Sequence, residues 1–189
     1  MSHRTAALLV VCSLAAPASA QHAGHSSPSA EGHMARVAGP AQPYASLRDR
    51  RVKALSEAQE ADLRAGRGMA LALAAELNGY PGPMHVLELA EALRLTPVQR
   101  AAAEALRARM AAEAQAIGAR MLVLEEELDG LFVSGDADTG RLAVLTAALG
   151  ALGGRLRETH LAAHIGMLAA LDPGQREAYA LLRGYVAAP

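Results

Sequence analysis

The sequence is poor in aromatic residues. Its 189 residues include no Trp, one Phe and four Tyr, so aromatic side chains make up 3% of a chain that is 52% hydrophobic. Sandwiches and barrels draw on aromatic and β-branched side chains, whereas Ala and Leu, which supply most of the apolar surface here, favour helices that pack closely. The composition therefore predicts an all-α fold.

Cysteine is almost absent as well. The single Cys, Cys12, lies in an apolar run at residues 6–16, which is too short to span a bilayer and is followed by an Ala-Ser-Ala cleavage pattern at 18–20. We expect residues 1–20 to be a signal peptide, and a chain that begins at Gln21 to reach the bacterial periplasm as a soluble protein without a membrane span. Without Cys, that chain has no disulfide and no thiolate chemistry.

A strong charge of one sign is also missing. The formal net charge is −1, which gives no general attraction to nucleic acid or to an anionic membrane. The sequence shows no Gly-rich phosphate loop after a strand and no pair of carboxylates placed for acid–base chemistry. We therefore expect no enzyme, no nucleic-acid partner and no required cofactor.

One short motif recurs at three places where a helix is expected to begin. Each copy has a Leu, then a capping residue, then a Gln three residues after the cap. The capping side chain can accept a hydrogen bond from the backbone N–H of the Gln, and the Gln side chain can reach back to the cap. The motif residues are Leu55, Ser56 and Gln59; Leu95, Thr96, Pro97 and Gln99; and Leu171, Asp172, Pro173 and Gln175.

Apolar residues recur at steps of three and four over residues 97–133 and again over 139–171. Such seams are typical of long helices packed along a partner, and at 1.5 Å per residue each would be about 50 Å long. The short connection between them predicts a long antiparallel helical hairpin. Shorter flanking helices are expected at 44–55, at 57–78 with a break near Gly66 and Gly68, at 84–94 and at 173–185. We expect 21–43 to be a flexible tail and 44–189 to be one helical domain.

The Leu-Ser/Thr-x-x-Gln motif and the two long helices resemble the LTxxQ group of periplasmic proteins over residues 55–185. That group contains the Spy/CpxP-type chaperones and the CnrX/ZraP-type heavy-metal sensors and resistance proteins. The resemblance implies a cradle-like antiparallel homodimer with a concave face. For a chaperone it implies ATP-independent binding of unfolded periplasmic proteins. For a sensor it implies an ion held by His, Glu and Met of neighbouring helices, and an inner-membrane sensor or regulatory partner.

Histidines provide the candidate metal ligands. His160 and His164 lie one helical turn apart, a spacing that lets two imidazoles share a metal, and Met167 follows on the same face. Hairpin geometry places Glu113 opposite His160, and folding back the short helix before the hairpin brings His85 near His164. Such a set would suit Zn, Ni or Cu. In the alternative interpretation, His160 is hydrogen-bonded to Glu113 inside the seam and His164 is exposed.

A second cluster of possible ligands lies in the expected tail. Soft or borderline cations such as Cu or Ni could bind there, and the alternative is a low-complexity linker without a metal. The residues are His22, His25, His33 and Met34.

Two sets of side chains could bind an unfolded client. Apolar residues left over on the outside of the hairpin need a further partner, and either the N-terminal helices or a second subunit would cover them. Where they stay open they would supply burial for a client, and arginines would supply capture, unless these arginines are simply solvated. The residues are Leu122, Leu161, Ile165 and Leu168, and Arg100, Arg107, Arg155 and Arg157. Acidic residues at 125–129 crowd the end of the first long helix, where the helix dipole disfavours negative charge, and Arg141 is expected to neutralise part of it.

The sequence thus favours a periplasmic, ATP-independent chaperone that binds unfolding clients on an amphipathic helical surface. The main alternative is a periplasmic heavy-metal sensor or resistance protein, and a third is a helical module that binds one partner protein. The near-neutral charge weakens the first interpretation, and the histidines strengthen the second.

Overall fold

The computed structural model describes residues 44–187 of the chain; the expected signal peptide at 1–20 and tail at 21–43 lie outside this part. The elements are a 3-10 turn η1 (Ala45–Leu47) and the helices α1 (Glu57–Ala65), α2 (Leu73–Glu76), α3 (Pro83–Glu88), α4 (Pro97–Val133), α5 (Thr139–Ala170) and α6 (Pro173–Leu182). Residues 44–187 contain no strand, which confirms the predicted all-α class.

The three capping motifs each start a helix, as predicted. Ser56, Thr96 and Asp172 each accept a hydrogen bond from the backbone N–H of the Gln three residues later, and that Gln side chain accepts from the cap's own N–H. Two of these glutamines also bond each other, since Gln99 Nε2 lies 2.8 Å from Gln175 Oε1. The motif therefore caps helices and also ties the start of α6 to the start of α4.

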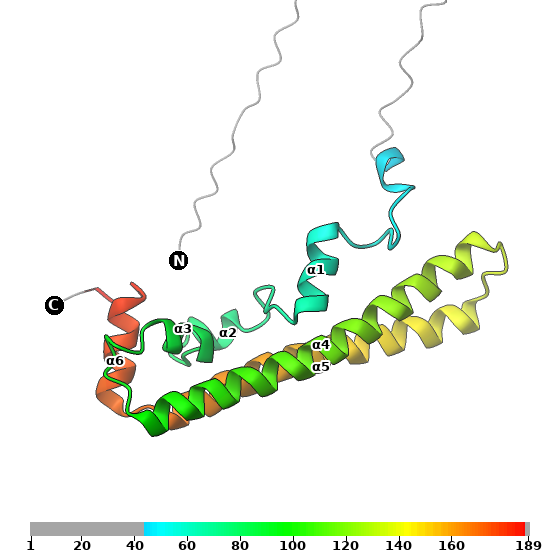
Figure 1. The fold of residues 1–189 in the computed structure, drawn as a ribbon. Helices are drawn as coiled ribbons and strands as arrows, with labels where there is room; N and C mark the ends of the chain where they lie inside the picture. Colours follow the sequence, from blue (N-terminus) through cyan, green and yellow to red (C-terminus); the bar gives the residue numbers. More distant parts are fainter. Residues whose placement is uncertain (1–43, 188–189) are drawn as a thin grey trace, which may run out of the picture. The chain divides into compact units, whose positions relative to one another are not determined.

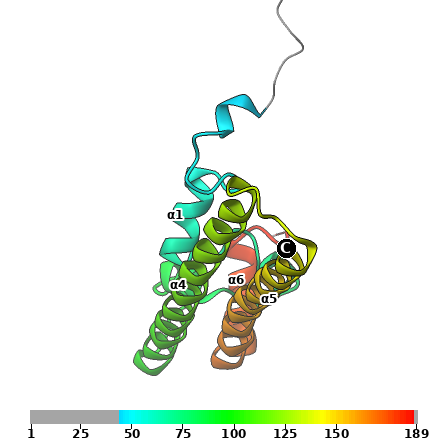
Figure 2. The same ribbon diagram turned by 90° about the vertical axis from the view of Figure 1, so that its right-hand side faces the viewer.

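α4 and α5 form the predicted antiparallel hairpin and lie side by side in Figures 1 and 2. Their bounds agree with the prediction to within one residue at each end. Two contacts define the register. Arg155 Nη2 donates to Glu113 Oε1 at 2.9 Å, and Gly166 lies so close to Leu106 that a Cβ would come 2.8 Å from Leu106 Cδ2.

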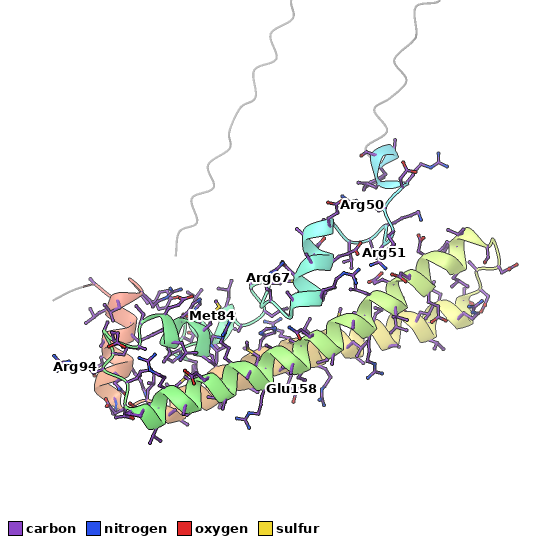
Figure 3. The ribbon with its side chains drawn as sticks, viewed as in Figure 1. Arg50, Arg51, Arg67, Met84, Arg94 and Glu158 are labelled. Carbon is purple, nitrogen blue, oxygen red and sulfur yellow. The ribbon has the colours of Figure 1, made fainter. Side chains whose placement is uncertain are left out.

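The helices that precede the hairpin cover one side of it. α1 and α3 pack on α4, and α2 and α3 pack on α5, while the Glu158 side chain points away from these helices (Figure 3). At Gly118 the backbone of α1 comes so near that a Cβ would lie 2.2 Å from Leu63 O. Two clusters of buried side chains result, one of Val86, Leu93, Ala103, Met167, Leu171 and Tyr179, the other of Leu63, Ala114, Ile117, Leu122 and Leu156.

Several shorter predictions need correction. Residues 44–55 form η1 and turns instead of a continuous helix. The predicted break is present at Gly66, whose φ is +65°, but helix resumes only in the four residues of α2. The helix expected at 84–94 ends at Glu88, and the last helix ends at Leu182 instead of 185. In these short segments tertiary contacts override the local pattern.

The outside of the hairpin also differs from the prediction in places. Leu122, expected to need a partner beyond the hairpin, is 3% exposed and shares the second cluster with Leu63 of α1, so an N-terminal helix covers it and it is not open to a client. Two carboxylates at the acidic end of α4 pair with the segment before α1 and not with Arg141: Arg51 pairs with Glu126, and Lys53 Nζ lies 2.6 Å from Asp129 Oδ2. Within the described residues, no helix has the length and apolar character to cross a membrane.

Candidate functional site

A cavity of about 500 Å³ lies between the α1–α3 segment and the hairpin. The segment that ends α1 and leads into α3 forms one wall, and facing turns of α4 and α5 form the other. Figure 3 shows Arg67 and Met84 on the first wall. The lining residues with polar or sulfur-containing side chains are Asp62, Arg67, Met69, Glu76, Met84, His85, Arg107, Met110, His160 and His164.

His160 is the least ordinary residue of this cavity. It is 3% exposed, and its Nε2 is buried without a hydrogen-bond partner among residues 44–187. Burial lowers the pKa of His160, and the neighbouring His164 lowers it further, so the ring is neutral at pH 7. Gly68 packs over the ring, and a Cβ added at Gly68 would lie 3.7 Å from His160 Nδ1, at ordinary contact distance. His160 thus lines the cavity with a neutral imidazole, of which one nitrogen is buried and has no hydrogen-bond partner among the described residues.

His164, one turn later, has its ring held by hydrogen bonding. Its Nδ1 lies 2.8 Å from the Tyr80 carbonyl oxygen, so Nδ1–H donates to that carbonyl, and the lone pair of the neutral ring then lies on Nε2. Gly82 packs against the same ring, where a Cβ would come within 3.1 Å of Nε2. A side chain at residue 82 would therefore push against His164.

Glu76 is a buried carboxylate that also lines the cavity. It is 5% exposed and accepts hydrogen bonds from the hydroxyls of Tyr179 and Tyr185 and from the Gly82 N–H at 3.0 Å. His85 Nδ1 lies 3.3 Å from Oε1. Burial alone would raise the pKa of Glu76, but the two tyrosine hydroxyls and the nearby histidines outweigh it, and the pKa is lowered. Burial and the bond to Glu76 raise the pKa of Tyr179.

The turn that carries Met69 is conformationally strained. Met69 and Ala70 have φ values of 40° and 62°, in the left-handed region that non-glycine residues rarely adopt. Two successive residues of this kind cost of order 1–3 kcal/mol each and persist where the surroundings hold them, often at ligand sites. Both residues line the cavity.

The structure brings together three of the five predicted ligands, since His85, His160 and His164 all line the cavity. Met167 is fully buried in the first core cluster instead. Glu113 does not contact His160: it is exposed and pairs with Arg155. The expected register was close, but Glu113 lies on the outer face of α4, and the residue that turns to the cavity at this level is Met110.

The candidate client-binding residues are scattered over the hairpin. Arg100 pairs with Glu91 at 2.7 Å and Arg155 with Glu113, whereas Arg107 lines the cavity and Arg157 is exposed. Of the apolar candidates besides Leu122, Ile165 is 60% exposed, and Leu161 and Leu168 are half-buried. The tail candidates His22, His25, His33 and Met34 lie outside the described residues.

Sequence reasoning missed Glu76 and its two tyrosines. Glu76 is the single charged residue in the apolar run 69–77, and such a position in a helix that must be buried is a signal that could have been used. Its partners Tyr179 and Tyr185 are about 100 residues away in sequence, so no spacing rule connects them. Two of the four tyrosines of the chain therefore donate hydrogen bonds to the same carboxylate.

Within the described residues, no three His, Cys, Asp or Glu side chains are already arranged around a common metal position. No protein-family model matches the chain, and no curated protein or solved structure matches it either.

Proposed function

We propose that this chain is a periplasmic heavy-metal sensor or resistance protein that binds its ion in the cavity between the α1–α3 segment and the hairpin. The observation that carries the proposal is the buried Nε2 of His160. A buried polar atom left without a partner costs about 1–3 kcal/mol, and His160 has none within the described part of the chain. An ion bound at this nitrogen would remove that cost.

The state of the two histidines supports the same proposal. Metal ions bind neutral imidazole, and the lowered pKa keeps His160 neutral. The bond from His164 Nδ1 to Tyr80 leaves Nε2 as the free nitrogen of that ring, and such second-sphere bonds commonly orient a ligating His. His160 and His164 lie on successive turns of α5, so one ion can reach both.

Glu76 offers a route from the ion to the rest of the fold. Its Oε2 lies 3.5 Å from His164 Nδ1, and its Oε1 accepts from Tyr179 of α6 and from Tyr185. A shift of His164 on ion binding would therefore act on the contact between α2 and α6. Such a coupling suits a sensor that passes its signal to an inner-membrane or regulatory partner.

Isothermal titration calorimetry with Zn²⁺, Ni²⁺, Cu²⁺ and Ag⁺ tests the proposal. The protein is the full exported chain in which His22, His25 and His33 are replaced by Ala, so that tail binding does not mask the cavity. We expect a one-site isotherm for at least one ion, absent from the His160→Ala/His164→Ala variant. The Arg157→Ala variant, altered at an exposed position of α5, is the control and should bind as the parent does. No binding of any of the four ions would refute the proposal.

An ATP-independent chaperone is the second candidate, and exposed apolar side chains at the tip of the hairpin favour it. Val123, Phe132, Val133 and Val144 are between 58% and 72% exposed, and exposed apolar side chains are what an unfolded client would contact. Suppression of client aggregation, measured with and without EDTA, separates the two candidates. A chaperone should remain active in EDTA and lose activity in Phe132→Ser, but not in Val98→Thr, a change at the other end of the hairpin.

A homodimer accompanies both candidates. Ile165 is 60% exposed on α5, and Glu158 marks a side of the hairpin that faces away from α1–α3 in Figure 3. We expect a second copy to pack on this side and form the cradle. If sedimentation equilibrium shows only monomer at concentrations on the order of tens of micromolar, the predicted dimer and the cradle that depends on it are both wrong.

A further inference from the structure

Three of the five methionines in the described residues line the cavity. These are Met69, Met84 and Met110. Met69 and Met121 both pack against the second core cluster, and Met167 belongs to the first. Met69 and Met110 are half-buried and Met84 is 47% exposed. Thioether side chains thus line the same cavity as the histidines, and Met84 and Met110 do so without belonging to either core cluster.

The residues that carry the two more buried thioethers lie at the level of His160. The contacts of Glu113 with Arg155 and of Leu106 with Gly166 set the hairpin register, and this register puts Met110 level with His160. On the opposite wall, Gly68 packs over the His160 ring: a Cβ added at Gly68 would lie 3.7 Å from His160 Nδ1. Met69 is the next residue along the chain. His160 therefore lies between the residues that carry the two sulfur atoms.

The oxygen ligands of the cavity are already in use. Glu76 accepts hydrogen bonds from two tyrosines and a backbone N–H, and Asp62 is paired with Arg67. A hard or borderline divalent ion would have to break these bonds to gain a carboxylate. Thioether sulfur is a weak hydrogen-bond acceptor, so recruiting the methionines breaks no strong bond.

We infer that the cavity is a site for a soft monovalent cation, Cu⁺ or its redox-inert substitute Ag⁺, held by His160 Nε2 and the sulfur atoms of Met110 and Met69. This inference rests on the proposed metal-binding function; it specifies the ion class and adds two sulfur ligands to the histidine site. Imidazole and thioether are neutral ligands, and thioether selects soft ions such as Cu⁺. A single positive charge is also less costly to bury than two. Met84, partly exposed at the cavity, is suited to pass the ion in from solvent.

The strained backbone at Met69 is consistent with this role. A φ of 40° at Met69 persists only where the surrounding structure holds it, and a residue held in this way presents its side chain in one orientation. Preorganised ligands bind more tightly because less conformational freedom is lost.

The test uses the full exported chain with His22, His25 and His33 changed to Ala and Met34 to Leu in every sample. Binding of Cu⁺ is measured under reducing conditions by competition with a chromophoric chelator, and binding of Ag⁺ by calorimetry. The variants are Met110→Leu, Met69→Leu and His160→Gln, with Met121→Leu as the matched control at a methionine outside the cavity. Circular dichroism confirms that each variant is helical.

We expect one equivalent of Cu⁺ or Ag⁺ in the parent. Even outer-sphere partners are worth about 10- to 100-fold in metal affinity, so each of the three ligand variants should lose about tenfold or more, while Met121→Leu should bind as the parent does. In the parent, the ¹³C-labelled methyl resonances of Met110 and Met69 should shift on adding Ag⁺, and that of Met121 should not. This second readout stands even if a Leu variant fails to fold.

The outcomes separate this inference from the function on which it rests. Zn²⁺ or Ni²⁺ binding that depends on His160, without Cu⁺ or Ag⁺ binding, would overturn the soft-ion site and leave the metal-binding function intact. Unshifted Met110 and Met69 methyls on Ag⁺ saturation would do the same. If the chain binds none of these ions, the inference and the proposed function both fail.

Discussion

Changing Glu76 to Gln is the most direct test of the polar cluster that joins α2 to α6. Gln has nearly the same shape as Glu, so packing is preserved while the charge and one acceptor oxygen are lost. In the native protein Oε1 accepts from the Tyr179 and Tyr185 hydroxyls, and Oε2 accepts from the Gly82 N–H. In either orientation of the amide, its NH₂ group takes the place of one carboxylate oxygen. Because NH₂ cannot accept a hydrogen bond, at least one of these donors loses its acceptor.

The magnitude follows from those contacts. A hydrogen bond to a charged group contributes about 1.5–3 kcal/mol, and a buried donor left without an acceptor costs about 1–3 kcal/mol. Because the Glu76 side chain is only 6% exposed, water cannot replace the lost acceptor. We therefore expect Glu76→Gln to lower the free energy of unfolding by about 2–4 kcal/mol. At about 2–4 °C per kcal/mol, the Tm should fall by about 5–15 °C.

Urea unfolding followed by circular dichroism measures this change. The matched control is Glu158→Gln, the same chemical change at a side chain that is 70% exposed and 3.9 Å from Arg155. Exposed ion pairs contribute little, so the control should stay within about 0.5 kcal/mol of the parent. In a Tyr179→Phe background, Glu76→Gln should cost less than in the parent, because one of its donors is already gone. Equal midpoints for the parent, Glu76→Gln and the control would refute the assigned role of Glu76.

Three further predictions follow from the same contacts. The folded-state pKa of Glu76 lies below its usual value. The contribution of the ionised carboxylate to stability is therefore complete above the unfolded pKa of about 4.3 and is lost as pH falls through the folded pKa. In urea unfolding measured at a series of acid pH values, the difference in stability between the parent and Glu76→Gln should shrink below about pH 4. Thr96→Ala removes the N-cap of α4 and should cost about 0.5–2 kcal/mol in the same assay, whereas an unchanged midpoint would mean that the cap contributes nothing. Gly118→Ala should lower the Tm because its Cβ would lie 2.2 Å from the α1 backbone; Gly130→Ala, with nothing within 4 Å in the described structure, should raise stability by up to about 1 kcal/mol.

The sequence was most informative where structure depends on neighbours within one helical turn. Thr96 with Gln99, and Asp172 with Gln175, determine where helices begin through bonds that span three residues. Apolar periodicity likewise identified both arms of the hairpin to within one residue at each end. Over residues 44–55 and 84–94 the pattern was weaker, and packing against α4 and α5 decided the outcome. The dimer, the cradle and the resemblance to the LTxxQ group stay predictions.

The candidate site divides in the same way. The spacing of His160 and His164 within one helix was visible in the sequence, because residues four apart on a helix share a face. The sequence did not show which face of α4 packs opposite these histidines. Glu113 and Met110 are three residues apart, and only the packing of α4 on α5 and α1 places Met110 at the cavity and Glu113 in solvent. Glu76 joins Tyr179 and Tyr185 across more than 100 residues. Local hydrogen bonds are decided by local sequence, but a buried polar cluster exists only where distant segments have packed and removed water.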